Sequence, residues 1–361
     1  MPSELESRAP GGAVLRKARA LLADDGLSCN GVEVVDRSPV GAGSVRIRPQ
    51  GPAEQWRETL TCWFGSQDWV ETLAVRPPHI YVRPTTDAIR SWVTEGWTAS
   101  LDALVCGPRL DIADIAPDAS SSLDSARRTA VARALTALSR WCGDPEQEAA
   151  SVFIGAAGTP VPPSGNLLTI GAVDVAHGPL RARYGGVVNT DDLLAEIECR
   201  TQARTGRVAG ADHAAAALSF LLLRTPCRRR ARMDDARIEA ETAVYGVLLS
   251  ARLCSRQNGL SGQDRTAVRK QNSEDSGRSL AITADQLPTV LQRSFSELEP
   301  ALLARYGCDL SRRITAAAPH LPPEDPLWQS AHRASAIVLD GLAGSLQITT
   351  SKNPEESMKC R

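Results

Sequence analysis

The chain has 361 residues, with 41 lysines and arginines against 42 aspartates and glutamates and a formal net charge of -1. This balance excludes a general attraction to polyanions, so any contact with a nucleic acid must come from a local basic patch. Aromatic residues make up only 4% of the chain, which disfavours a stacking platform for single-stranded bases. The length is sufficient for two or three domains with separate cores.

The nine cysteines and five histidines are scattered along the chain, and no C-x-x-C pair occurs. Disulfide frameworks and zinc sites need tighter clusters, so we expect reduced thiols and no bound metal. The N-terminal "MPSELESRAPGG" lacks the apolar core of a signal peptide. The longest apolar run, at 214–223, is shorter than a membrane span. We therefore expect a soluble, cytoplasmic protein with no membrane partner.

Residues 1–100 are predicted to form a small α/β domain with an antiparallel sheet. The segment "AVLRKARALLADDG" has the pattern of an amphipathic helix closed by Gly26. A second helix, "TTDAIRSWVTEGW", is predicted to begin at Thr85 or Thr86 and to stop at Gly96. Four short β-branched segments between the helices predict strands: "GVEVVD", "SVRIRP", "VETLAVR" and "HIYVRP".

The next segment, 101–190, contains a pattern typical of a phosphate-binding helix. In "APDASSSLDSARRTAVARALTALSRWCG" (116–143), serines and an aspartate precede apolar residues at helical spacing. A helix N-terminus after a strand is where nucleotide-binding folds place phosphate. Further on, "LLTIGAVDVAHGPLRARYGGVVNTDDLLAEI" predicts a strand, a loop, a second strand, and a helix capped by Asn189 or Thr190.

The remainder, 191–361, shows apolar residues at i, i+3 and i+4 in several long segments and predicts an all-α helical bundle. Within it, residues 257–280 are polar and poor in aliphatic side chains, which predicts a disordered insert.

One segment of the helical half, "ETAVYGVLLSARL", is similar to the signature helix of arginyl-tRNA synthetases. The matching residues are Thr242, Ala243, Tyr245, Ala251 and Arg252, while Val244 stands where the family has proline. Upstream, "VAGADHAAAALSFLLLRTP" resembles the segment that names the DALR anticodon-binding domain. There "SFLLLR" is kept, and the naming tetrapeptide reads Ala215, Ala216, Ala217 and Leu218.

Both catalytic signatures of that family are altered at the positions that resemble them. The KMSK-type signature falls on Pro179, Leu180, Arg181, Ala182 and Arg183. The HIGH signature falls on Ser122, Leu123, Asp124 and Ser125, with Arg127 and Leu135 matching beyond it. Only some two dozen residues separate Gly143 from Leu167, an interval in which the family keeps most of its nucleotide-binding fold and its arginine pocket.

The resemblance implies three consecutive parts. Residues 1–100 correspond to the family's added N-terminal α/β domain, 101–190 to a shortened Rossmann-like remnant of the catalytic domain, and 191–361 to a DALR-like anticodon-binding domain. In the family, the signature histidines and lysine stabilise the charge that develops on the α-phosphate of ATP. Their absence here implies no amino-acid activation and no cofactor, with ATP required only if the chain is an enzyme. The alternative reading of Ser122 to Ser125 is plain capping of a buried helix.

Candidate tRNA contacts come from a run of arginines and from the signature helix. They are Arg224, Arg228, Arg229, Arg230, Arg232, Tyr245 and Arg252. Guanidinium groups can pair with phosphates, and Tyr245 can stack on a base. The alternatives are a solvated loop for the arginines and core packing for the face that holds Tyr245 and Arg252.

Three functions follow. The first is a synthetase-like pseudoenzyme that binds tRNA, or a synthetase partner, without activating arginine. The second is a divergent arginine-tRNA ligase that still uses ATP. The third is a protein–protein interaction module derived from a synthetase.

Overall fold

The computed structural model describes most of the chain between residues 12 and 343. The described residues are 12–27, 29–35, 38–41, 44–102, 104, 106–114, 122–156, 158–160, 163, 165–176, 188–205, 211–254, 270–321 and 325–343. An α/β N-terminal part is followed by a helical C-terminal part, which confirms the predicted fold class.

The N-terminal strands form one antiparallel sheet in the order β1-β2-β4-β3. Their bounds are β1 Cys29–Val35, β2 Ser44–Pro49, β3 Val70–Arg76 and β4 His79–Pro84. Val45 and Ile47 on β2, and Ile80 and Val82 on β4, are fully buried and alternate with more accessible residues. This period of two gives the sheet one apolar face, which is the pattern of a half-buried antiparallel sheet.

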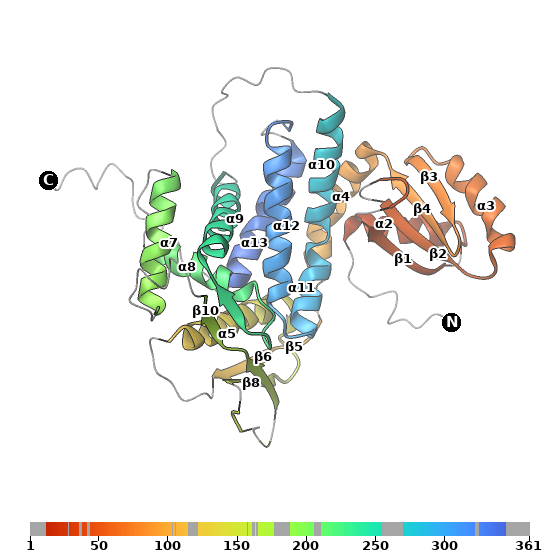
Figure 1. The fold of residues 1–361 in the computed structure, drawn as a ribbon. Helices are drawn as coiled ribbons and strands as arrows, with labels where there is room; N and C mark the ends of the chain where they lie inside the picture. The colour runs from red at the N-terminus through yellow and green to blue at the C-terminus, as the bar shows by residue number, and fades with distance from the viewer. Residues whose placement is uncertain are drawn as a thin grey trace. The chain divides into compact units, whose positions relative to one another are not determined.

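Three helices accompany the sheet: α2 Ala13–Asp24, α3 Ala53–Gly65 and α4 Thr86–Asp102. Helix α2 packs on β1 and on α4 (Figure 1). It ends as predicted, because Gly26 has a φ of +69° and so adopts the left-handed conformation that stops a helix. The predicted stop of α4 at Gly96 is wrong. At Gly96 an added Cβ would lie 2.7 Å from Ala13 Cβ, so this glycine permits close packing of α4 on α2.

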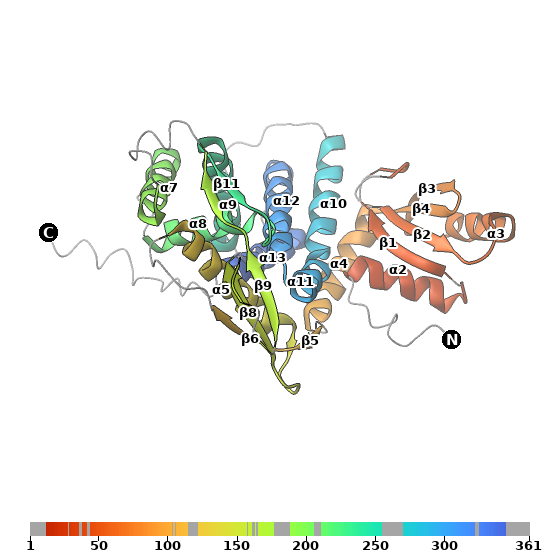
Figure 2. The same cartoon turned by 60° about the horizontal axis from the view of Figure 1, so that its bottom comes forward.

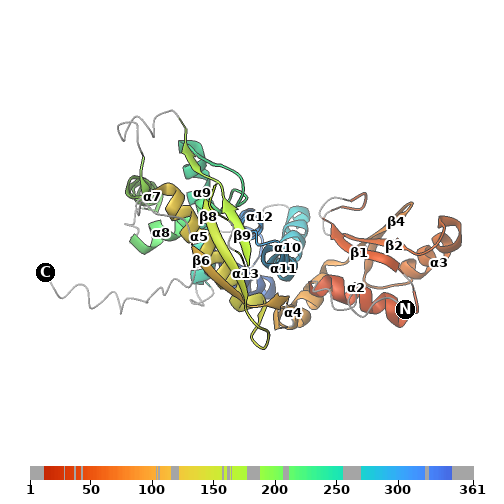
Figure 3. The ribbon, with the colours of Figure 1, turned by 90° about the horizontal axis from the view of Figure 1, so that it is seen from below.

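The middle of the chain contains a parallel sheet of three strands in the order β6-β8-β9. These are β6 Leu110–Asp114, β8 Ala150–Ala156 and β9 Asn166–Ile170. Helix α5, Leu123–Cys142, connects β6 to β8, so the three elements form a β-α-β unit, and Figures 2 and 3 show the strands side by side. Two further short strands, β5 Gly107–Pro108 and β7 Gly143–Asp144, pair in parallel with each other.

In the C-terminal part, most of the described residues are helical. Its helices are α7 Thr190–Thr205, α8 Ala211–Leu223, α9 Asp235–Cys254, α10 Lys270–Asp285, α11 Leu287–Ser296, α12 Ala301–Ala317 and α13 Pro326–Ala343. Strand β11, Ala231–Met233, interrupts the helices and pairs in parallel with β10, Val173–Val175. Neither β11 nor this pairing was predicted from the sequence. Because α10 begins at Lys270, the predicted insert at 257–280 extends too far; residues 257–269 lie outside the described residues.

The chain folds into two compact units that are interleaved in the sequence. The first comprises Met1–Arg109, Leu138–Ala149 and Ala243–Val338, and the second comprises Leu110–Ala137, Ala150–Thr242 and Leu339–Arg361. The first unit therefore holds the antiparallel sheet with α10, α11 and α12. The second holds the parallel sheet, the start of α5, and the segment that includes β11.

Within the first unit, a buried aspartate connects α10 to α2. The carboxylate of Asp285 accepts the backbone N–H groups of Ala13 (2.5 Å) and Val14 (3.1 Å). These are two of the donors that a helix N-terminus leaves without an intrahelical partner, so Asp285 caps α2 from another helix. Burial raises the pKa of Asp285 to about 7, against the smaller lowering effect of the two N–H groups.

This pKa predicts an unusual pH dependence for the stability of the first unit. The folded state favours the neutral acid, so the contribution of Asp285 is complete below its ordinary pKa near 4 and is lost as the pH rises through about 7. We expect the free energy of unfolding of the wild type, relative to that of Asp285→Asn, to fall by up to about 4 kcal/mol between pH 4 and pH 8. Urea unfolding of both proteins at these pH values measures it. A pH-independent difference contradicts the prediction.

Candidate nucleic-acid interface

The N-terminus of α5, where the phosphate-binding pattern lies, is held by hydrogen bonds to backbone groups. The Ser125 N–H donates to Ser122 Oγ at 3.1 Å, so Ser122 caps the helix. The Val173 N–H donates to Asp124 Oδ1 at 2.6 Å, which attaches the helix to β10. Leu123 and Ser125 are each only 7% exposed. The capping interpretation of this stretch is confirmed, and its polar groups act in the packing of the second unit.

One turn further along α5, Arg127 is fully buried and its guanidinium donates to four peptide carbonyls. The acceptors are the carbonyl oxygens of Gly171 (2.6 Å), Arg229 (2.7 Å), Pro226 (2.9 Å) and Thr225 (3.0 Å). Three of these belong to the segment between α8 and β11. A single planar, always-charged side chain thus fixes the backbone of that segment.

We call residues 224–232 the basic loop. Its backbone is also tied to the end of β9, since the Gly171 N–H donates to the Cys227 carbonyl (2.8 Å) and the Ala231 N–H to the Ala172 carbonyl (2.9 Å). The two segments approach so closely that a Cβ added at Gly171 would lie 2.4 Å from the carbonyl oxygen of Arg229. The atoms of the basic loop that lie closest to Gly171 belong to its backbone and cannot rotate away as a side chain could, so position 171 requires glycine.

A Gly171→Ala variant tests this close approach. We expect it to lower the free energy of unfolding by about 2–3 kcal/mol, because neither backbone can retreat without breaking the bonds around Arg127. Gly246→Ala is the matched control. Gly246 lies in α9 with open space around its missing Cβ, so alanine there is expected to be neutral or to stabilise by up to about 1 kcal/mol. Equal effects of the two substitutions in thermal unfolding contradict the prediction.

The basic loop presents four of the predicted arginines to solvent: Arg228, Arg229, Arg230 and Arg232. Arg230 Nη1 lies 3.4 Å from Asp174 Oδ2, and both side chains are more than half exposed. Such an exposed pair stabilises the fold little, so it does not hold Arg230 away from a ligand. The four guanidinium groups are therefore exposed close together in sequence on a loop with a fixed backbone.

Arg224 differs from its neighbours, because its Nε donates to Glu241 Oε1 at 2.8 Å and its side chain is only 22% exposed. Its charge is compensated inside the fold, which corrects its prediction as a phosphate contact. A half-buried arginine that the sequence reasoning missed, Arg237, supports the same region by donating to the Leu221 and Arg232 carbonyls and to Thr225 Oγ1. Burial lowers the pKa of Arg237 below its ordinary value.

The signature helix α9 does not offer the predicted stacking residue to a base. Tyr245 is 5% exposed and lies in the core, so the alternative of core packing holds for it. The backbone of Arg252 lies in α9, but its side chain is outside the described residues, as are all of Pro179, Leu180, Arg181, Ala182 and Arg183. The candidate interface that the structure describes is therefore the exposed part of the basic loop.

Among the residues that the structure describes, no group of three or more histidine, cysteine, aspartate or glutamate side chains is arranged to hold a metal ion. No helix in the same part of the chain is both long and apolar enough to cross a membrane.

No family model matches the sequence, and no curated protein matches it. Among solved structures, the chain is similar to the arginyl-tRNA synthetase of Thermus thermophilus, with 15% sequence identity and a TM-score of 0.41. The match covers 91% of this chain and 57% of that enzyme, so this chain spans little more than half the length of the protein it resembles.

Proposed function

We propose that the protein is a tRNA-binding relative of arginyl-tRNA synthetases that does not activate arginine. Two things support the proposal. The sequence carries the family's patterns in the family's order, from the altered HIGH position at Ser122 to the signature helix that contains Tyr245. The main observation in favour of tRNA binding is the exposure of four arginines on the basic loop, whose backbone is fixed by hydrogen bonds: Arg228, Arg229, Arg230 and Arg232.

The fixed backbone of the basic loop favours binding, because affinity is lost when a flexible segment must first be ordered. Arg127 and the Gly171 contact hold the backbone of the basic loop before any ligand arrives. Guanidinium groups on such a loop pair with successive phosphates through strong, charge-assisted hydrogen bonds. An RNA backbone supplies several phosphates at short intervals, and we propose tRNA because of the sequence resemblance.

Loss of activation follows from the residues at the HIGH position. Transition-state stabilisation in these enzymes requires donors aimed at the α-phosphate. Here Ser122 and Asp124 accept hydrogen bonds from the backbone, and an ionised aspartate repels an approaching triphosphate. We therefore propose neither ATP nor another cofactor for this protein.

Two measurements test the proposal. The first is filter binding of bulk tRNA across a salt series, where we expect binding that weakens steeply with salt. Weak binding that is insensitive to salt and to the loss of Arg228, Arg229 and Arg230 contradicts it and leaves the protein-interaction module. The second is arginine-dependent exchange between ATP and pyrophosphate. Exchange above background contradicts the loss of activation and supports a divergent arginine-tRNA ligase.

A further inference from the structure

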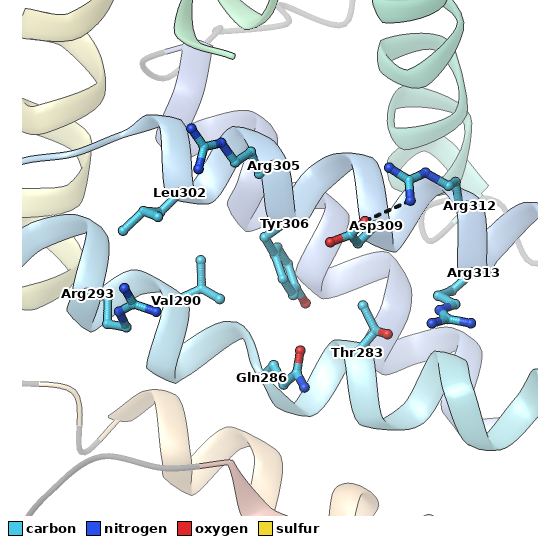
Figure 4. A pocket seen from close by; sticks show the side chains of 10 residues that line it. All are labelled: Thr283, Gln286, Val290, Arg293, Leu302, Arg305, Tyr306, Asp309, Arg312 and Arg313. Atoms are coloured by element: carbon cyan, nitrogen blue, oxygen red, sulfur yellow. Dashed lines mark ion pairs between the residues drawn. The ribbon is translucent and has the colours of Figure 1, made fainter. Parts of the chain in front are cut away.

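A pocket of about 540 Å³ lies between α10, α11 and α12, within the first unit. Its rim carries four arginines, Arg293 from α11 and Arg305, Arg312 and Arg313 from α12 (Figure 4). None of these residues belongs to the basic loop, which lies in the second unit.

Positive charge at this pocket is only partly compensated. Arg312 Nη1 lies 3.1 Å from Asp309 Oδ1, and Arg293 Nη2 lies 3.0 Å from Glu297 Oε1. Arg305 and Arg313 pair with no carboxylate in the part of the chain that the structure describes. The four guanidinium groups outnumber the two carboxylates that pair with them. The nearby Asp285, whose pKa burial raises to about 7, adds a negative charge only when it is ionised, so the local charge stays positive.

The wall of the pocket contains a buried hydroxyl without a partner. Tyr306 is 5% exposed, and its hydroxyl has no hydrogen-bond partner among the described residues. Its ring points from α12 across the pocket toward Gln286 and Thr283 (Figure 4). Burial raises the pKa of Tyr306 well above its ordinary value, so the group stays protonated and can donate. Buried polar groups are nearly always satisfied, so this hydroxyl is a donor available to a ligand that enters the pocket.

We propose that this pocket binds a ligand with two or more linked phosphate groups. Arg305 and Arg313 stand at opposite ends of the pocket (Figure 4). They are eight residues apart on one helix, so the rise between them is about 12 Å. A short chain of phosphates is long enough to contact both arginines along the pocket and also to accept a hydrogen bond from Tyr306. The inference does not rest on tRNA binding by the basic loop.

The test uses the full chain and sodium tripolyphosphate as the probe, with calorimetry at fixed ionic strength. We expect the double variant Arg305→Ala, Arg313→Ala to bind at least about tenfold more weakly than wild type. The control is Arg57→Ala with Arg133→Ala, which removes two exposed arginines elsewhere and is expected to leave binding unchanged. No binding by the wild type, or equal loss in the control, overturns the proposal.

Tyr306→Phe separates a binding role from a structural one. Removal of an unsatisfied buried hydroxyl is expected to leave the melting temperature of the free protein unchanged or higher. Binding of tripolyphosphate is expected to weaken about three- to tenfold, since the same hydroxyl donates to the bound ligand. A lower melting temperature with unchanged binding overturns the assigned role of the hydroxyl.

Two further probes, ATP and a short oligoribonucleotide, identify the source of the phosphates. Tighter binding of ATP than of tripolyphosphate assigns the pocket to a free nucleotide. Tighter binding of the oligoribonucleotide assigns the pocket to an RNA backbone, provided that two conditions hold. This binding must be lost when Arg305 and Arg313 are replaced, and it must be kept when Arg228, Arg229 and Arg230 are replaced. Loss only with the latter three arginines places phosphate binding in the basic loop and overturns the proposal without touching the proposed function.

Discussion

Replacement of Arg127 by leucine is expected to lower the free energy of unfolding by about 4 kcal/mol and to weaken tRNA binding together with stability. The guanidinium is fully buried and donates to four carbonyls. Each buried carbonyl left without a donor costs about 1–3 kcal/mol. Water that enters the space left by the guanidinium recovers part of the total cost for the four carbonyls. Because three of the acceptors are in the basic loop, the loop is also expected to lose its fixed backbone.

A lysine at position 127 is expected to recover only part of the loss, since an ammonium cannot reach the four carbonyls with a planar fork. Arg133→Leu is the matched control. It removes an exposed arginine from the same helix and is expected to change stability by no more than about 0.5 kcal/mol. Urea unfolding measures all three variants. A loss at Arg127 that is no larger than the loss at Arg133 contradicts the account of the basic loop.

Much of the local structure was predictable because the relevant signals are local. The four N-terminal strands have β-branched residues at regular spacing, and α5 begins where a serine precedes an apolar helix pattern. Gly96 shows the limit of such signals. In the sequence, a glycine within a helix pattern looks like the end of the helix. Gly96 lies inside α4 instead, where it leaves room for the close packing of α2.

The parts of the candidate site that sequence reasoning missed depend on contacts between distant segments. Strand β11 has only three residues and exists because β10 pairs with it, so no periodicity was available to predict it. Arg127 matched the family pattern, but a sequence does not distinguish a buried arginine bound to carbonyls from an exposed one. Arg224 and Arg228 look alike in the run "RTPCRRRAR", and Glu241, 17 residues away, makes the difference.

Tyr245 illustrates the same limit for function. The sequence around Tyr245 was compatible both with core packing of this helix face and with a base-stacking residue. Burial of Tyr245 and Leu248 settles it in favour of the core. At this position of α9, Tyr245 therefore packs in the core. The remaining candidate RNA contacts among the described residues are the arginines of the basic loop.

Simultaneous replacement of Arg228, Arg229 and Arg230 by alanine is expected to weaken tRNA binding by about two orders of magnitude at 0.1 M salt. Each arginine that neutralises one phosphate releases about 0.7–0.9 of a counterion, so loss of three contacts lowers the slope of log affinity against log salt by about 2–3. The fold is expected to survive, because Arg127 binds the carbonyl oxygen of Arg229, which alanine retains.

The matched control for this triple variant is Arg57→Ala, Arg133→Ala and Arg140→Ala, which removes the same charge from exposed positions outside the basic loop. A general electrostatic attraction responds equally to both triple variants, because it depends on net charge alone. A local site responds only to the first, and its salt slope falls in proportion to the phosphates that the loop contacts. Equal slopes for the two variants in filter binding therefore contradict a tRNA site on the basic loop, even if both bind more weakly than wild type.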